Sequence, residues 1–332
     1  MFRKKIFIFI TLLLSSCTNS SDCFREDVFC AGLVTDTLGI EDQGVNQDAW
    51  VGLQQLESED LVNEIAYIES VDTRDYRKNI DFFIEQGYDV IITSGIGLDD
   101  ETLRASILTP DSVFIGINQP QTDAPTNYIS LTFAEDQMGF LAGVLAAKLT
   151  QTNIVGGVCE TSDIDSMWRY CEGFRAGVEY IDDSIDVVII YRDNGDREKL
   201  FIDEAWGIEQ TIYLMNRGVD VIFAAGGVTG QAALKTASEA GIYAIGSERN
   251  QVAVLGESGK GVVTSIYGSA SFEVQRMMRL IKEGNIPQVE SGQFGYVALH
   301  QKFPEELSLE LETILKSLLS GDVQTNVLLQ KP

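Results

Sequence analysis

Short apolar runs rich in β-branched residues alternate with longer amphipathic stretches along the chain beyond residue 30. Runs of this kind are typical of buried strands, and the stretches between them are long enough to form helices. Strands that alternate with helices form parallel sheets, because each helix carries the chain back to the edge where its strand began. The pattern therefore predicts an α/β protein.

One strand–helix–strand pattern occurs twice in the chain. Residues 87–95 (GYDVIITSG) and 218–226 (GVDVIFAAG) are both Asp-led apolar strands that end in small residues. Each pattern also has an earlier apolar strand and a later strand that ends in Ile-Gly. The earlier strands cover residues 31–36 and 154–159, and the later ones cover residues 114–116 and 244–246. Any two parallel strands share some features, but three matches in the same order predict two doubly wound, Rossmann-like lobes.

Helix signals and the lack of a linker indicate where the lobes meet. Thr132 and Glu135 have capping-box spacing before the apolar stretch 138–149, and helical periods follow at 271–281 and after Pro304. No Pro- or Ser-rich linker separates the halves, so we expect a hinge of short crossovers. The crossovers are expected near residues 131–134, 264–267 and 295–299. The predicted first lobe comprises residues 31–132 and 267–296, and the predicted second lobe comprises residues 133–266 and 297–332.

The chain begins with the features of a secretory leader. Three basic residues precede the apolar run 6–14, which is shorter than the about 20 residues needed to span a bilayer. The run ends in Leu-Ser-Ser-Cys17, which resembles the bacterial lipobox, where the cysteine is acylated and becomes the mature N-terminus. We therefore expect residues 1–16 to be a signal peptide and residues 17–30 to be a lipidated cysteine and tether. An ordinary signal peptide that contains a cysteine is the alternative.

Export makes disulfide bonds possible for the other four cysteines. Cys23, Cys30, Cys159 and Cys171 form an even set, and each cysteine has one close neighbour in the sequence. Pairing of these neighbours is the simplest of the three possible pairings, but the sequence does not choose among them. No two cysteines have the CxxC spacing of a zinc or redox site.

Composition and charge exclude several classes of function. The chain has 332 residues, with 24 Lys+Arg against 50 Asp+Glu, a net charge of −26 and one histidine, His300. Such acidity argues against a nucleic-acid partner, because nucleic-acid surfaces need a basic footprint. A single histidine makes a His-based triad or multi-histidine metal site improbable, and no GxSxG, HExxH, P-loop or calcium-loop motif is present. We therefore predict a protein that is not an enzyme and needs no metal or cofactor.

The strand ends supply the candidate binding residues. In open α/β sheets, ligands bind beyond the carboxyl ends of the strands, so two lobes that face each other would enclose a cleft there. Small residues at these ends let backbone N–H groups and helix N-termini approach a polar ligand. The first lobe would contribute Asp36, Ser94, Gly95 and Asn118, and the second Glu160, Gly226, Gly227 and Glu248.

Several segments resemble the basic-membrane-protein (BMP) family of lipoproteins. The longest is GLVTDTLGIEDQGVNQDAWVG at residues 32–52, and the others cover residues 131–143, 173–177, 219–227 and 244–251. The resemblance spans nearly the whole mature chain and includes the lipobox. It implies the type I periplasmic-binding-protein fold and the role of a substrate-binding protein of an ABC importer. It also implies a purine nucleoside or related ligand, permease and ATPase partners, lipid attachment to the cell membrane on its extracytoplasmic side (periplasmic or outer face), and a monomer.

The family's ligand residues match this chain only in part. The resemblance assigns Asp36 and Asn46 to the first lobe, Phe201 to the aromatic before Asp203, and Gly226 with Gly227 to the second lobe's strand end. Four positions depart from the family pattern. Val45 stands where the family has a base-stacking Phe, Asn118 and Glu248 where it has Asp, and Gly268 where it has Lys.

These departures predict a different or weaker ligand. Val45 lacks a stacking face, which is worth about 1–3 kcal/mol per base. Gly268 removes a cation, and the amide of Asn118 donates as well as accepts. Trp168, near the start of an expected helix, is a candidate for a substitute stacking surface, with ordinary packing as the alternative.

Two other functions remain open at this point. One is a surface sensor or antigen-type lipoprotein that has lost transport, which the altered pocket residues also fit. The other is a Rossmann-like enzyme acting on a nucleotide, supported only by the glycine-rich turn at residues 226–230.

Overall fold

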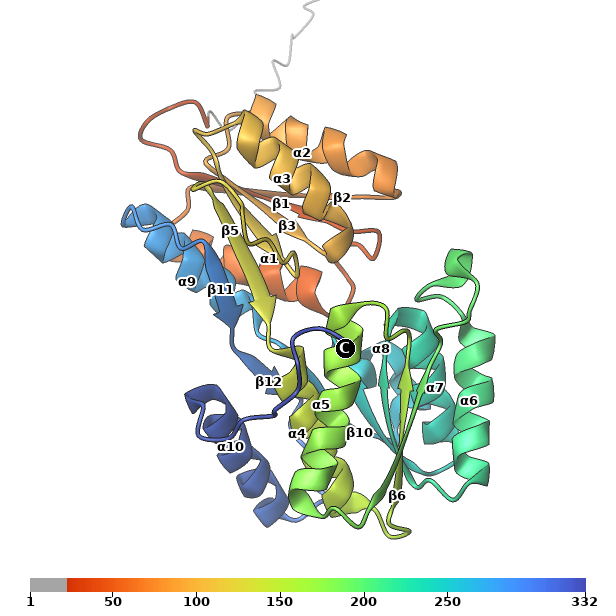
Figure 1. The fold of residues 1–332 in the computed structure, drawn as a ribbon. Coiled ribbons are helices and arrows are strands. Elements are labelled where there is room, and N and C mark those ends of the chain that lie inside the picture. The colour runs from red at the N-terminus through yellow and green to blue at the C-terminus, as the bar shows by residue number, and fades with distance from the viewer. Residues whose placement is uncertain (1–22) are drawn as a thin grey trace, which may run out of the picture.

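The computed structural model describes residues 23–332, which form two α/β lobes (Figure 1). The predicted signal peptide and Cys17 lie outside the described residues. Each lobe is built on one six-stranded sheet. In order across the first sheet, the strands are β11 (Val289–Gly292), β5 (Tyr128–Phe133), β4 (Val113–Ile117), β3 (Val90–Ser94), β1 (Cys30–Thr35) and β2 (Glu64–Glu69). All neighbouring strands of this sheet are parallel.

The second sheet repeats this order. Its strands are β12 (Phe294–Tyr296), β10 (Val262–Gly268), β9 (Tyr243–Ser247), β8 (Val221–Ala225), β6 (Ile154–Cys159) and β7 (Asp186–Tyr191). Only the short edge strand β12 runs antiparallel to its neighbour. Each strand of one sheet thus has a counterpart at the same place in the other. The predicted repeat and the doubly wound topology are confirmed.

Helices cover the faces of both sheets. In the first lobe α1 (Val45–Ser58) packs on α9 (Ala270–Lys282), and α2 (Tyr76–Glu85) packs on α3 (Asp99–Leu108). In the second lobe α4 (Glu135–Leu149) packs on α5 (Asp165–Ile181), and α6 (Glu204–Asn216) packs on α7 (Gly227–Glu239). The short α8 (Gln251–Leu255) follows β9, and α10 (Glu305–Ser320) packs on α4.

Glycines set the close approach of α4 and α5. A Cβ on Gly139 would lie 1.9 Å from the carbonyl oxygen of Tyr170, and one on Gly177 would lie 2.0 Å from the carbonyl oxygen of Phe140. The two helix backbones therefore touch along their length, and no larger residue fits there.

Three crossovers join the lobes. The chain passes from β5 to α4, from β10 to α9 and from β11 to β12. The division predicted from the sequence assigned residues up to 296 to the first lobe, but β12 pairs with β10 in the second sheet. The third crossover therefore lies near residue 293. The ring of Phe133 packs at the hinge, because a Cβ on either Gly268 or Gly292 would come within 2.5 Å of it.

The predicted helices are present, with one correction. The helix expected after residue 138 begins at Glu135, and it has no capping bond from Thr132 because Thr132 belongs to β5. The last helix ends at Ser320 and is capped by Gly321, whose φ is +78°. The C-terminal segment then returns along α5 (Figure 1).

Two local disulfide bonds are present. Cys23 is joined to Cys30 at the start of β1, and Cys159 at the end of β6 is joined to Cys171 on α5. The simplest of the three possible pairings is therefore the one observed. The second bond ties a strand of the second lobe to the helix that covers it.

Candidate functional site

The first lobe brings three predicted residues together at the carboxyl ends of its strands. Asp36 follows β1, Gly95 follows β3 and Asn118 follows β4. The N–H of Asp36 donates to the carbonyl of Ser94 at 3.1 Å, and the N–H of Gly95 donates to the carbonyl of Ile117 at 3.1 Å. Gly95 has a φ of +115°, and a Cβ there would lie 2.8 Å from the Asp36 carboxylate. Glycine is therefore required for Asp36 to occupy this position.

Asn46 holds the carboxylate of Asp36 in place. It lies in the first turn of α1, is fully buried, and donates from Nδ2 to Oδ1 of Asp36 at 2.9 Å and to the carbonyl of Gly39 at 2.9 Å. Burial raises the pKa of Asp36, and the hydrogen bond from Asn46 opposes this shift. The half-buried Val45 is the first residue of α1.

The start of α1 depends on an acid that the sequence analysis did not single out. The buried carboxylate of Asp42 accepts hydrogen bonds from the N–H groups of Gly44 at 2.8 Å, Asn46 at 3.2 Å and Gln47 at 3.0 Å. A carboxylate at this end of a helix satisfies donors that have no partner within the helix and complements its dipole. An acid three residues before the first residue of α1 is the signal in the sequence that marks this helix start.

The second lobe repeats the arrangement with different side chains. Glu160 follows β6, Gly226 follows β8 and Glu248 follows β9. The N–H of Glu160 donates to the carbonyl of Ala225 at 3.1 Å, as Asp36 does in the first lobe. Gly226 has a φ of +122°, and a Cβ there would lie 2.4 Å from the Cβ of Glu160. Glu248 has a φ of +67°, close to the +60° of Asn118 at the matched position.

Glu160 is held by a buried ion pair. Its carboxylate contacts Nη1 of Arg192 at 2.9 Å, and the two side chains are 0% and 1% exposed. Arg192 also contacts the carboxylate of Asp203 at 3.1 Å and donates to the carbonyl of Asp196 at 2.6 Å. Arg192 was not predicted from the sequence, because a single arginine after a strand has no motif that marks it.

Phe201, Gly227 and Glu248 lie together at the start of α7. The carbonyl of Phe201 accepts from the N–H of Val228 at 2.8 Å, and a Cβ on Gly227 would lie 2.8 Å from that carbonyl oxygen. The N–H of Gly227 donates to the Glu248 carboxylate at 3.3 Å. Burial raises the pKa of Glu248, while Arg249 and this hydrogen bond oppose the shift. Phe201 is half-buried and has a φ of +65°, which is strained backbone for a non-glycine residue.

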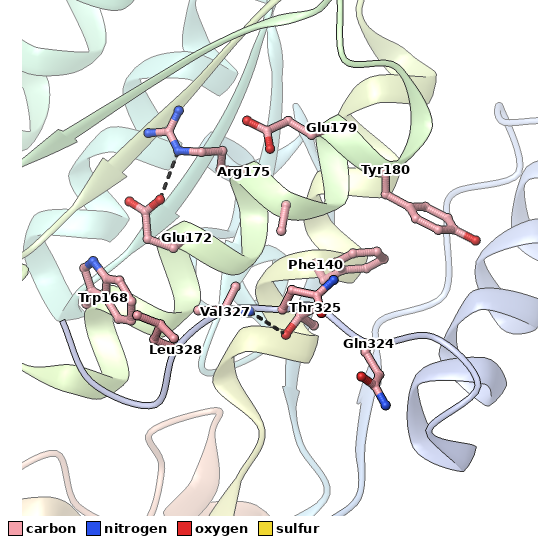
Figure 2. Close-up of a pocket in the computed structure, with 12 residues that line it drawn as sticks. Phe140, Trp168, Glu172, Arg175, Glu179, Tyr180, Gln324, Thr325, Val327 and Leu328 are labelled. Carbon is pink, nitrogen blue, oxygen red and sulfur yellow. Dashed lines mark hydrogen bonds and ion pairs between the residues drawn. The ribbon is translucent and has the colours of Figure 1, made fainter. Parts of the chain in front are cut away.

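Two of the predicted binding residues, Gly268 and Trp168, lie against residues that do not follow the other strand ends. Gly268 ends β10 against the ring of Phe133, so a lysine side chain would fit there only if that ring moved. Trp168 lies in the first turn of α5 and lines a hollow of about 540 Å³ between α5 and the C-terminal segment, beside Leu328 (Figure 2). None of the strand-end residues lines this hollow, so the role of Trp168 as a stacking surface stays a prediction.

Unpartnered polar atoms gather at the strand ends. In the part of the chain that the structure describes, five buried side-chain atoms have no hydrogen-bond partner. They are Asn46 Oδ1, Ser94 Oγ, Glu160 Oε2, Arg249 Nε and Gln251 Oε1. Each belongs to a strand-end residue or to a neighbour of one, and each costs about 1–3 kcal/mol of folding free energy. Such a concentration is typical of a place where function rather than stability selects the residues.

The strand ends of the two lobes meet. Arg249 donates from Nη1 to the carbonyl of Asp42 at 3.1 Å, and the N–H of Asn250 donates to the carbonyl of Gln43 at 3.0 Å. These bonds join the loop after β9 to the loop before α1, so segments that follow strand ends in the two lobes contact each other.

Within residues 23–332, no group of acidic, histidine or cysteine side chains is arranged to hold a metal ion. No described helix has both the length and the apolar character needed to span a bilayer.

Known proteins are similar to this chain in sequence and in architecture. The profile of the Bmp family, described as ABC transporter substrate-binding protein PnrA-like, matches residues 30–313. The CD4+ T-cell-stimulating antigen of Listeria monocytogenes is 26% identical over 94% of both chains. The ABC transporter nucleoside-binding protein BmpA of Lactococcus lactis is 33% identical over 60% of this chain and 55% of that protein.

Solved structures confirm the fold. An ABC transporter solute-binding protein of Conexibacter woesei matches with a TM-score of 0.72 and 19% identity, over 89% of this chain and 98% of that one. A solute-binding protein of Aeropyrum pernix matches with a TM-score of 0.69 and 17% identity, over 89% and 92%. The two lobes have the type I periplasmic-binding-protein fold. The Bmp profile describes a binding protein rather than an enzyme. Since this profile covers most of the chain, the chain belongs to the Bmp family of PnrA-like ABC transporter substrate-binding proteins.

Proposed function

We propose that this protein is a lipid-anchored, extracytoplasmic receptor that closes around a nucleoside-like molecule and presents it to an ABC permease and its ATPase. The anchor would be Cys17, and the receptor would act as a monomer. The observation that carries the proposal is the set of carboxylates and unpartnered buried polar atoms at the facing strand ends of both lobes.

The chemistry of the site favours a ligand rich in hydrogen-bond donors. Asp36 and Glu248 are half-buried, and an ionised carboxylate only accepts hydrogen bonds. Ribose hydroxyls are suitable donors, and each charge-assisted bond is worth about 1.5–3 kcal/mol. The half-buried ring of Phe201 offers one apolar face for a base. The relative named as a nucleoside-binding protein supports the same ligand class.

Closure explains how binding becomes a signal to the permease. A ligand that contacts both lobes binds the closed state more tightly than the open one, so it shifts the population towards closure. No covalent step is needed.

A thermal-shift and calorimetric panel of nucleosides, bases, sugars and amino acids tests the proposal. A ligand at 100 times its Kd should raise the free energy of unfolding by about 2.7 kcal/mol. Stabilisation by a nucleoside alone supports the proposal, whereas stabilisation by a sugar or an amino acid assigns another ligand class. Mass spectrometry of the mature protein, with Cys17→Ser as the control, tests the anchor.

A surface sensor or antigen that no longer transports is the second candidate. It is favoured by the packing of Phe133 where the family has a lysine side chain at position 268. Binding of no member of the panel, with the fold intact by circular dichroism, would support this candidate.

A further inference from the structure

Arg249 and Gln119 occupy matched positions after the two strand-end residues Glu248 and Asn118, but their side chains point to different lobes. Gln119 is fully buried and donates from Nε2 to the carbonyl of Gly95 at 3.0 Å, within its own lobe. Arg249 is only 9% exposed, and it reaches the carbonyl of Asp42 in the other lobe at 3.1 Å. The backbone repeat is kept at these positions, but the Arg249 side chain crosses between the lobes and the Gln119 side chain does not.

The turn around Glu248 aims Arg249 across the cleft. The N–H of Arg249 donates to the carbonyl of Ser247 at 2.7 Å, which closes a three-residue turn around Glu248 at a φ of +67°. A turn of this kind costs free energy for a non-glycine residue. Gly44 completes the fit, because a Cβ there would lie 2.8 Å from the Cβ of Arg249.

The charge of Arg249 acts on acids of both lobes. It lowers the pKa of Asp36 in the first lobe and of Glu248 in the second, in each case against the larger effect of burial. Closure brings these like charges together, which disfavours the closed state unless a cation lies between them. The family's lysine position, Gly268, supplies no cation here.

We propose that Arg249 is a positioning residue that latches the closed state, by bonding to the backbone of the first lobe between the ligand-facing carboxylates of the two lobes. The proposal rests on the proposed binding of a small molecule between the lobes. The Nε of Arg249 has no hydrogen-bond partner, so the guanidinium does not make all the hydrogen bonds that it could make. A latch of this kind holds the lobes together around a ligand and still opens without one.

Crosslinking measures the latch without any ligand. The backbones of Gln43 and Asn250 are joined by a hydrogen bond across the lobes, so cysteines at these positions form a disulfide only when the lobes meet. The parent is therefore Gln43→Cys/Asn250→Cys. Adding Arg249→Gln should slow crosslinking in a glutathione buffer by about tenfold or more, as expected for a lost charge-assisted bond.

Two further variants control the crosslinking experiment. Arg249→Lys keeps the charge but not the planar fork, and it should restore part of the rate. Arg279→Gln removes an exposed arginine that pairs with Glu59, and it should leave the rate unchanged. Crosslinking of Arg249→Gln at the parent rate would overturn the proposal.

The affinity for inosine, measured from pH 8 to pH 5, separates the effect of the Arg249 charge from the effect of losing its side-chain volume. Without the Arg249 charge, the pKa values of Asp36 and Glu248 rise, so affinity for inosine should fall at a higher pH in Arg249→Gln than in the wild type. The other titratable groups around these carboxyls are Asp42 and Tyr76 near Asp36, and Glu160 and Tyr170 near Glu248. An equal loss of affinity at every pH would overturn the electrostatic part of the proposal.

The two arms also separate this inference from the proposed function. If inosine and other nucleosides do not bind the wild type, the proposed ligand is wrong, and the crosslinking rates still decide whether Arg249 is a latch.

Discussion

The two lobes carry the same strand-end backbone but different side-chain chemistry. In the first lobe, Asp36 is held by the neutral amide of Asn46. In the second, Glu160 is held by the charged guanidinium of Arg192, with both side chains almost completely buried. The comparison shows that the repeat preserves glycines and main-chain bonds, whereas the polar partners are free to differ. We expect the two lobes to respond differently to matched substitutions.

The largest difference should come from removing the ion pair of the second lobe. Arg192→Met leaves the Glu160 carboxylate buried without a partner, which we expect to cost about 3–5 kcal/mol of unfolding free energy. Urea denaturation measures this loss, with the exposed Arg74→Met as the control. Asn46→Ala in the first lobe should cost less, because it removes hydrogen bonds from a carboxyl that is only half-buried. Equal losses would contradict the comparison.

The matched glycines give the next largest effect. Gly226→Ala should destabilise the protein by about 2–3 kcal/mol and Gly95→Ala by about 1–2 kcal/mol, because both have a positive φ. The difference arises because the new Cβ meets the Cβ of Glu160 at 2.4 Å but only the movable carboxylate of Asp36 at 2.8 Å. Gly241→Ala, where nothing lies within 4 Å, isolates the effect of φ alone. A larger loss at position 95 than at 226 would reverse this reasoning.

Ligand affinity tests whether both lobes contribute. Asp36→Ala in the first lobe and Phe201→Ala in the second should each weaken the bound ligand by about tenfold or more, the value of one charge-assisted bond or one stacking face. Isothermal titration calorimetry measures the change, and the exposed Asp60→Ala serves as the control. If both variants bind like the wild type, the site assignment is wrong although the fold is right.

The smallest effect should be in the pH dependence of stability. Burial raises the folded-state pKa of Asp36 above 3.8, so the folded protein binds its proton more tightly than the unfolded chain. The contribution of Asp36 to stability is therefore present at low pH and is lost as pH rises through its unfolded and then its folded pKa. Relative to the wild type, Asp36→Asn should gain stability between pH 4 and pH 7. The same sign is expected for Glu248→Gln.

The fold was largely predictable because it depends on local pattern. Matched apolar strands at 87–95 and 218–226 predicted the repeat, and both lobes have it. The exact crossover near 293 was not predictable, because β12 is a short edge strand whose partner is set by contact rather than by its own sequence. The false capping box at Thr132 has the same cause, since pairing with neighbouring strands holds that residue in β5.

The strand topology predicted the candidate site residues that directly follow a strand, whereas Asn46 and Phe201 came only from the family resemblance. Asp36, Glu160 and Glu248 follow from the rule that ligands bind at strand ends. Arg192 and Asp42 were missed, because their importance comes from the groups they contact. Trp168 was proposed for its chemistry, and the hollow that it shares with Leu328 of the C-terminal segment was not predictable from the sequence (Figure 2).

The sequence by itself determined the two lobes and three matched strands in each, because hydrophobic periodicity is a local property. Only the tertiary structure decided which charges are paired and which cross between lobes. Arg192 lies opposite Glu160, and Arg249 lies opposite Asp42, at separations of 32 and 207 residues along the chain. The first contact depends on how neighbouring strands pair within one lobe, and the second depends on how the two lobes pack, which no local pattern encodes.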